Sequence, residues 1–466
     1  MTSKAACGQG LGVIAIAVAA PLLIAAIASA QAPAQRVTFR EGTRVSVGHA
    51  PVAVAVSQLD SQPWPDLVVM SDSSVTTFLG NPAWGFETPH DRFVAPGLVG
   101  LALLGGFDVV VSAPASGAVF TLHGVGDGTF TAGDTLSGPW APGALQLWWH
   151  GTSSVPDLVA ADLFFQAVVL ATNDGSGRFS FDRQFSGFID PVAMTLGNVD
   201  GDGVADLVVA DQVSRTVSVL PDFAQAGPVA RHDTTLPGRP VALTVANLNG
   251  DGYDDVIVTT RDPGALVVLL GAADGSLHPA FSYAAGTDLP ALVVADFDRD
   301  GFADVAVADR TTNSIGIWLG AGDGSLAHAT SIPTDAAPTA LALGQMDADF
   351  WLDLVCANHD GGTVQVFLNA TSPPDAMHLL APTPNPTASG CTLSFVLSAP
   401  ARARIEIHDL TGRIVRRLID QTLTTGTQHV TWDGRTDAGR PAHSGLYFAR
   451  VRAGNVDATA RIVLQR

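Results

Sequence analysis

Short apolar segments recur between residues 51 and 370, and loops rich in Asp, Asn and Gly separate them. The pattern is clearest in PVAMTLGNVDGDGVADLVVAD from Pro191, PVALTVANLNGDGYDDVIVTT from Pro240 and PALVVADFDRDGFADVAVADR from Pro290. Apolar runs of about four to eight residues that are bounded by turn residues are typical of buried β-strands. Each stretch therefore predicts two strands joined by a polar loop, and the TVSVL, ALVVLL and SIGIWL segments that follow predict a third.

Weaker copies extend this repeat in both directions, so that its units start near residues 51, 97, 142, 191, 240, 290 and 338. Asp-Gly pairs near the end of most units favour tight hairpins and hence a fourth strand. A period of about 40–50 residues with several strands per unit is typical of a β-propeller. We therefore predict an all-β chain whose residues 31–370 form a seven-bladed β-propeller.

The last unit lacks a fourth strand after VQVFLN, whereas an unpaired strand-like segment precedes the first unit at residues 36–48. We expect this segment to complete the seventh blade and close the ring, because closure removes exposed sheet edges. The alternative interpretation is an open, extended array.

The C-terminal part has a different pattern. Residues 371–387 are rich in Pro and predict a linker. Residues 388–466 alternate apolar and polar positions in CTLSFVLS, RARIEIHDL, QHVTWDG, GLYFARVRAG and ATARIVLQR, with glycines at turns. This alternation predicts a small Ig-like β-sandwich.

Residues 1–30 combine one lysine, Lys4, with an apolar run and the small-residue end Ala28-Ser29-Ala30. This combination predicts a secretory signal peptide, and hence a secreted protein at the outer cell surface or beyond it. The alternative is an N-terminal membrane anchor. No later stretch is apolar enough over about 20 residues to predict a transmembrane helix in the mature chain.

Charge narrows the possible functions. The chain has 24 Lys and Arg against 44 Asp and Glu, a net charge of −20, and no lysine follows Lys4. Once residues 1–30 are removed, the chain contains no lysine, which excludes P-loop and Schiff-base sites because both need one. The acidic balance argues against nucleic acid as a partner. Only Cys356 and Cys391 remain, in different predicted domains, so no disulfide framework is expected.

Three loops share the pattern [DN]-x-[DN]-x-D-G-x-x-D, whose oxygen-bearing residues alternate along a stretch that a glycine allows to curl. Calcium prefers about six to eight oxygen ligands, which such a curl would converge on one point. Strands rather than helices flank these loops, so they are not EF-hands. The predicted ligands are Asn198, Asp200, Asp202 and Asp206 in the first loop, Asn247, Asn249, Asp251 and Asp255 in the second, and Asp296, Asp298, Asp300 and Asp304 in the third. The alternative interpretation is a polar turn that binds nothing.

The remaining repeats depart from this pattern. The last keeps Gln345, Asp347, Asp349 and Asp353 but has Phe350 in place of the glycine, which puts metal binding there in doubt. Asp60 and Asp66 are remnants in a Pro-rich loop, and Asp108 and Asp157 stand nearly alone. We expect three calcium sites and one doubtful one.

With the D-x-D-x-D-G-x-x-D loops and the trailing G-D-G-x-F of Gly126–Phe130, residues 36–370 resemble the FG-GAP or VCBS repeat family. This resemblance implies a calcium-binding propeller in secreted or surface proteins that bind other molecules. The C-terminal domain resembles the type IX secretion sorting domain and the flagellar hook-capping Ig-like domain. The residues that carry this resemblance are Pro384-Asn385-Pro386, Asp409, Gly412-Arg413, Trp432-Asp433-Gly434, Gly439 and Ser444-Gly445-Leu446-Tyr447. It implies recognition by a secretion machinery.

The chain contains neither H-E-x-x-H nor G-x-S-x-G, and its histidines are scattered. We expect no catalytic residue and no enzyme activity. We expect a binding or adhesion module for an extracellular protein or glycan at the bacterial cell surface. The alternative is a secreted polysaccharide hydrolase or lyase with its site in the propeller funnel, and a third interpretation is a purely structural surface protein.

Overall fold

The computed structural model describes residues 37–48, 50–149, 155–225, 230–347, 351–371, 377–379, 382–397, 401–410, 413–424, 426–453 and 456–465. The predicted signal peptide lies outside these ranges. Within them, no helix has the length and apolar character that a membrane crossing requires.

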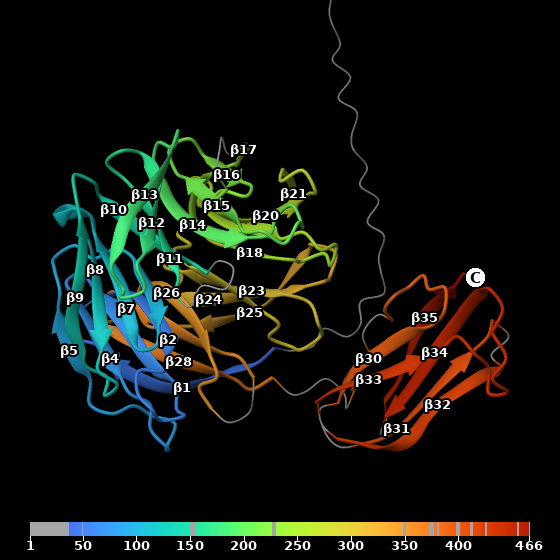
Figure 1. Ribbon diagram of the computed structural model, residues 1–466. Helices are drawn as coiled ribbons and strands as arrows, with labels where there is room; N and C mark the ends of the chain where they lie inside the picture. Colours follow the sequence, from blue (N-terminus) through green and yellow to red (C-terminus); the bar gives the residue numbers. More distant parts are fainter. Residues whose placement is uncertain are drawn as a thin grey trace, which may run out of the picture. The chain divides into compact units, whose positions relative to one another are not determined.

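Seven four-stranded antiparallel sheets form the larger part of the fold, as predicted (Figure 1). From the innermost strand outward, the blades are: blade 1, β2 (Pro51–Ser57), β3 (Asp66–Ser71), β4 (Ser74–Phe78) and β5 (His90–Phe93); blade 2, β6 (Leu101–Gly105), β7 (Asp108–Ala113), β8 (Ala118–Gly124) and β9 (Phe130–Ser137); blade 3, β10 (Pro142–Trp148), β11 (Asp157–Asp162), β12 (Ala167–Asn173) and β13 (Phe179–Ser186); blade 4, β14 (Pro191–Gly197), β15 (Asp206–Asp211), β16 (Thr216–Leu220) and β17 (His232–Thr235); blade 5, β18 (Arg239–Ala246), β19 (Asp255–Arg261), β20 (Ala265–Gly271) and β21 (Leu277–Tyr283); blade 6, β22 (Leu292–Ala295), β23 (Asp304–Asp309), β24 (Ser314–Gly320) and β25 (Leu326–Pro333); and blade 7, β26 (Pro338–Gly344), β27 (Asp353–Asn358), β28 (Thr363–Asn369) and β1 (Phe39–Ser46). One short 3₁₀ turn, Pro114–Ser116, joins β7 to β8.

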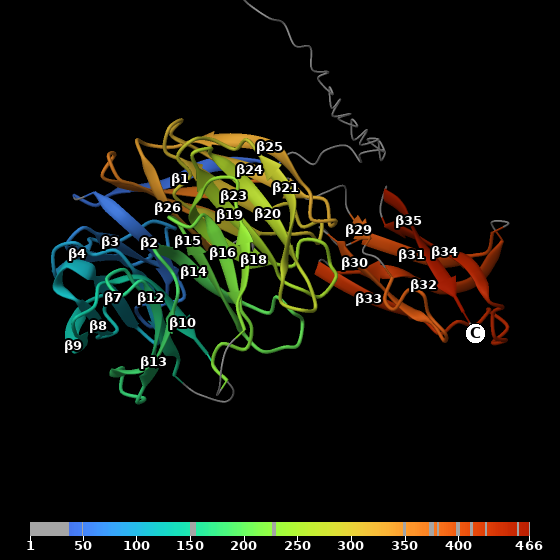
Figure 2. The same ribbon diagram turned by 90° about the horizontal axis from the view of Figure 1, so that it is seen from above.

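The blades form a closed ring. Each innermost strand contacts the innermost strand of the next blade, in the order β2, β6, β10, β14, β18, β22 and β26, and β26 contacts β2 again. Seen from above, the sheets surround a common axis (Figure 2). The outer strand of blade 7 is β1, which precedes blade 1 in the sequence and pairs antiparallel with β28. The first strand of the propeller and its last strands thus share one sheet, which closes the ring.

Burial follows the position of a strand in its blade. Nearly every residue of the second strands, such as β15 and β23, is buried, because neighbouring blades cover both faces. Outer strands such as β13 expose most of their residues. This arrangement explains why the second strands are continuous apolar runs, whereas the outer strands are mixed.

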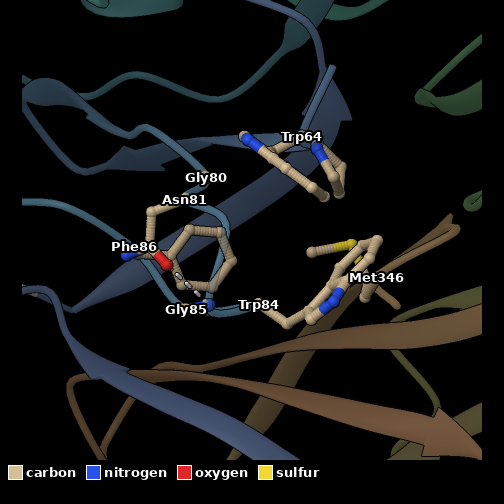
Figure 3. Close-up of a pocket in the computed structure, with 8 residues that line it drawn as sticks. Trp64, Gly80, Asn81, Trp84, Gly85, Phe86 and Met346 are labelled. Carbon is tan, nitrogen blue, oxygen red and sulfur yellow. Dashed lines mark hydrogen bonds between the residues drawn. The ribbon is translucent and has the colours of Figure 1, made fainter. Parts of the chain in front are cut away.

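Aromatic contacts join blade 7 to blade 6 and blade 7 to blade 1. The ring of Phe39 on β1 packs edge-on against Phe297, with centroids 5.7 Å apart. Trp64 and Trp84 of blade 1 are 5.0 Å apart at 83° and share a pocket with Met346 from the loop after β26 (Figure 3). The pocket holds only about 10 Å³, which is room for roughly one water molecule. These tryptophans therefore serve packing between blades rather than ligand binding.

The C-terminal sandwich consists of the sheet β29 (Met377–Leu379), β30 (Cys391–Leu397) and β33 (Gly426–Trp432), and a second sheet in the order β32 (Ile414–Leu423), β31 (Ala401–His408), β34 (Gly445–Ala453) and β35 (Val456–Leu464). Trp432 is fully buried in the core between them, and its indole N–H donates to the carbonyl of Arg435. The hydroxyl of Tyr447 donates to the carbonyl of His443. Cys356 and Cys391 are both free and buried.

Candidate metal centre

The three predicted calcium loops occupy equivalent places in successive blades. They join the innermost strand to the second strand in blade 4 (β14–β15), blade 5 (β18–β19) and blade 6 (β22–β23). The first two loops touch, because the amide of Asn198 donates to the Asp254 carboxylate at 2.8 Å and the amide of Asp254 donates to the Asn198 carbonyl at 3.0 Å. The first and second loops are thus joined directly to each other.

The repeated pattern produces the expected curl. The fifth position of each loop accepts a hydrogen bond from the amide two residues later: Asp202 from Val204, Asp251 from Tyr253 and Asp300 from Phe302, at 2.7–2.9 Å. The glycine between them has a positive φ of 88° at Gly203, 95° at Gly252 and 92° at Gly301. Such a backbone strongly favours glycine, and this explains the sixth position of the pattern.

The Asp at the ninth position has a structural role that sequence reasoning missed. In blade 6, one carboxylate oxygen of Asp304 accepts the amide of Phe297 at 2.8 Å, and the other accepts the amide of Gly320, sixteen residues later, at 2.9 Å. The side chain thereby ties the loop to the end of the third strand. Since Asp304 is 0% exposed, both amides would lack a partner without it.

This tie recurs in all seven blades, including those without the rest of the calcium pattern. The Asp that begins each second strand accepts from an amide at the end of its blade's third strand. The seven pairs are Asp66 with Gly80, Asp108 with Gly124, Asp157 with Asn173, Asp206 with Asp222, Asp255 with Gly271, Asp304 with Gly320 and Asp353 with Asn369. Asp66, Asp108 and Asp157 thus have a structural hydrogen bond of their own, which does not depend on a metal in the loop.

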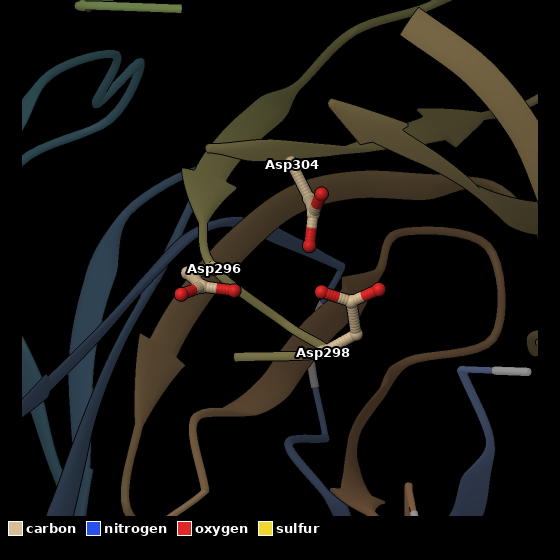
Figure 4. Close-up of side chains that lie close together, drawn as sticks. All are labelled: Asp296, Asp298 and Asp304. Atoms are coloured by element: carbon tan, nitrogen blue, oxygen red, sulfur yellow. The ribbon is translucent and has the colours of Figure 1, made fainter. Parts of the chain in front are cut away.

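The third loop brings carboxylates together most closely. Oxygens of Asp296, Asp298 and Asp304 lie within 4.8 Å of one another, and Figure 4 shows the three groups turned toward a common point. Asp298 is 2% exposed. Burial, with repulsion from neighbouring carboxylates, raises the pKa of Asp298 to about 7 and that of Asp304 to about 8. A bound cation would favour the ionised form of both groups and lower these pKa values.

This donor set fits a calcium ion. Calcium binds oxygens at roughly 2.3–2.6 Å, so two oxygens on opposite sides of one ion are roughly 4.6–5.2 Å apart. The separation within the cluster allows one ion to touch all three carboxylates. Asp300 completes the predicted set, and its amide donates to both Asp296 and Asp298.

The first and second loops place fewer charges together. In the second, Asn247 and Asn249 are neutral, and the side-chain amide of Asn249 donates to Asp251 at 2.9 Å. In the first, burial raises the pKa of Asp206 to about 6 and also raises the pKa of Asp200. Among the described residues, a group of three Asp, Glu, His or Cys side chains close enough to hold one ion is found in the third loop. We therefore expect the third loop to bind calcium most tightly.

Asp222, which sequence reasoning missed, adds charge to the first loop. It follows β16, its amide donates to Asp206 at 3.0 Å, and its charge contributes to raising the pKa of Asp200. The equivalent residues of the other blades are Gly or Asn, so the signal was present in the repeats.

The scattered histidines, Trp148 and the doubtful blade 7 loop have structural contacts or lie outside the described residues. Nδ1 of His123 donates to the Asp108 carboxylate at 2.9 Å, which makes it a paired histidine. Trp148 packs on Phe223 at 5.2 Å. Asp347 pairs with Arg40 at 3.4 Å, while Asp349 and Phe350 of that loop, and His49 and His150, lie outside the described residues.

Comparisons with known proteins agree with this architecture. Residues 247–307 and 296–356 match the FG-GAP-like repeat, and residues 385–457 match the FlgD Ig-like domain. No curated protein matches the chain by sequence.

Solved structures are similar in fold alone. The BBS1N structure in complex with ARL6DN is 12% identical, with a TM-score of 0.54, and the match covers 72% of this chain and 99% of BBS1N. Virginiamycin B lyase from Staphylococcus aureus is 11% identical, with a TM-score of 0.51, and the match covers 71% of this chain and 99% of the lyase. A propeller with FG-GAP-like repeats indicates a binding or scaffold module.

Proposed function

We propose that this chain is a secreted, calcium-stabilised binding module that presents its propeller to an extracellular protein or glycan at the bacterial cell surface. The observation that carries the proposal is the set of three equivalent Asp and Asn loops in successive blades, with three carboxylates converging in the third. Such loops hold their blades in one geometry once a cation offsets the repulsion of their carboxylates. A rigid ring of loops is suited to recognition.

The C-terminal sandwich serves export or attachment in this proposal. The match of residues 385–457 to the FlgD Ig-like domain and the type IX resemblance support this assignment. Residues 381–466 hold eleven Arg and six acids, a net charge of +5. In their sheet β32-β31-β34-β35, Arg404 and Arg417 pair with the buried Glu406, and Arg402 pairs with Asp420. A chain truncated after residue 380 would stay inside the cell envelope, as fractionation and blotting would show.

Similar folds do not decide between binding and catalysis, since one similar structure is a complex with another protein and the other is a lyase. The test is to incubate residues 31–466 with immobilised extracellular glycans and proteins, and to read retention and polysaccharide chain length together. Binding without chain shortening supports the proposal. Calcium-independent cleavage of a polysaccharide would replace it with the hydrolase or lyase alternative.

A further inference from the structure

The turn between β11 and β12 in blade 3 differs from the six equivalent turns. It carries Leu163, Phe164 and Phe165, which are 37%, 68% and 49% exposed. The equivalent turns are Asp72-Ser73, Pro114–Gly117, Gln212–Arg215, Asp262–Gly264, Arg310–Asn313 and His359–Gly362, and none contains Phe, Tyr or Trp. Three consecutive exposed apolar residues are unfavourable in water unless a ligand covers them.

Phe165 of this turn lines a cleft of about 310 Å³. Phe165, Phe181 and Trp140 provide aromatic walls, and Asp182, Arg183 and Gln184 of β13 provide polar groups. The volume is at the lower end of the range typical of small-molecule sites, roughly 300–1,000 Å³. At the back of the cleft, Trp140 is 5% exposed and packs edge-on against Phe181 with centroids 5.0 Å apart.

A β-bulge in blade 3 creates the mixed lining. Phe181 pairs with Ala171 and Arg183 pairs with Leu170, so that Asp182 is the extra residue between them. Phe181 and Gln184 consequently lie opposite Ala171 and Val169, on one face of the sheet, which brings an aromatic ring and an amide to the same cleft. Nη1 of Arg183 donates to the carbonyls of Phe223 and Gln225, which anchors its guanidinium to the segment after β16.

The chemistry of the cleft selects a class of ligand. A pyranose ring has an apolar C–H face that stacks on aromatic rings and a rim of hydroxyls that both donate and accept hydrogen bonds. The carboxylate of Asp182 accepts, and the amide of Gln184 both donates and accepts, so these two polar groups match such a rim. The indole N–H of Trp140 is also buried without a partner among the described residues, and a ligand or water oxygen would satisfy it. An apolar side chain of a protein partner would instead leave these polar groups without hydrogen bonds.

The charge of the propeller selects an uncharged ligand. Residues 31–380 contain 12 Arg, no Lys and 38 acids, so their net charge is 12 − 38 = −26. This field repels anionic polysaccharides and anionic lipid surfaces.

We propose that the blade 3 cleft, lined by Trp140, Phe165, Phe181, Asp182, Arg183 and Gln184, is a binding site for a neutral glycan. This inference rests on the proposed binding function and gives it a location and a ligand class.

The test measures binding of neutral tetrasaccharides of glucose, galactose, mannose and xylose to residues 31–466 by calorimetry and tryptophan fluorescence. Phe165→Ala and Phe181→Ala each remove a half-exposed ring, and each should weaken binding about tenfold. Phe93→Ala is the matched control, since Phe93 is 68% exposed on β5, outside the cleft, and it should bind as wild type does. Unfolding midpoints of all variants confirm that they are folded.

The results separate this inference from the proposed function. Glycan binding that Phe165→Ala and Phe181→Ala leave unchanged overturns the cleft but supports a binding module. Retention of a protein partner that both variants abolish, with no glycan bound, overturns the ligand class. Cleavage of the oligosaccharides overturns the proposed function itself.

Discussion

The buried Asp that ties each loop to its third strand allows a quantitative prediction, and blade 7 is the best place to test it. Asp353 is 0% exposed and accepts the amide of Met346 at 2.6 Å and that of Asn369 at 2.7 Å. Its loop has Phe350 where the calcium loops have glycine, so calcium is not expected to compensate. Asp353→Ala leaves two buried amides without their acceptor.

Each unsatisfied buried amide costs about 1–3 kcal/mol, and water entering the cavity would satisfy part of this loss. We therefore expect Asp353→Ala to lower the free energy of unfolding by about 3 kcal/mol. Asp353→Asn retains one acceptor oxygen and should lose about half as much. Asp360→Ala in the same blade is the control. Asp360 is exposed, and among the described residues its side chain pairs with His359.

The assay is guanidinium unfolding of residues 31–466, followed by tryptophan fluorescence, once with calcium and once with chelator. The loss should be the same in both conditions, and Asp360→Ala should leave the midpoint unchanged. A loss that appears only with calcium, or Asp353→Ala behaving like Asp360→Ala, would refute the structural role.

Three further predictions follow from burial and packing. In chelator, folded Asp298 and Asp304 hold protons up to pKa values of about 7 and about 8, whereas the unfolded groups release theirs near 3.8. The stability that these protons confer is complete below about pH 4 and is lost as the pH rises toward 8. In denaturation series over this range, wild type should therefore lose stability relative to Asp298→Asn, and calcium should cancel the difference. A gain of stability by wild type relative to the variant would contradict the assignment. Burial raises the pKa of both thiols, to about 11 for Cys391, so mass spectrometry should find iodoacetamide adducts at Cys356 and Cys391 only after unfolding. Phe39→Ala removes the ring that packs on Phe297 and should cost about 1–3 kcal/mol of stability in guanidinium unfolding, whereas an unchanged midpoint would exclude a role for this contact in ring closure.

The sequence was most informative where the repeat is most regular. Seven starts at a near-constant spacing predict seven blades, because each unit needs neighbours to bury both faces of its sheet. The position of Gly203, Gly252 and Gly301 likewise predicts the positive φ that the loops adopt.

The two roles of the ninth position were harder to separate. Asp206, Asp255 and Asp304 look like metal ligands in sequence, yet Asp66 and Asp157 occupy the same place without a calcium pattern. An Asp at this position in every repeat, with or without the calcium pattern, indicates that backbone amides rather than a metal require it. The partner amide lies about sixteen residues away, across a hairpin whose register the sequence does not specify.

The blade 3 cleft shows what the sequence cannot supply. Leu163–Phe165 is visibly apolar among polar sister turns, so the exposed patch was predictable in principle. The bulge at Asp182, which places Phe181 opposite Ala171, depends on strand pairing and appears only in the structure.

Calcium binding by the third loop is the central claim, and the most direct test is calorimetric titration of residues 31–466 with calcium. The comparison is Asp298→Asn against Asp323→Asn, because each changes one Asp of blade 6. Asp298 belongs to the carboxylate cluster, whereas Asp323 lies in the β24–β25 turn and accepts hydrogen bonds from Ser325. The account predicts that wild type and Asp323→Asn bind calcium and unfold at higher temperature with it, while Asp298→Asn loses the tightest site. No heat of binding, or equal binding by all three chains, would show that the loops are turns held by hydrogen bonds alone.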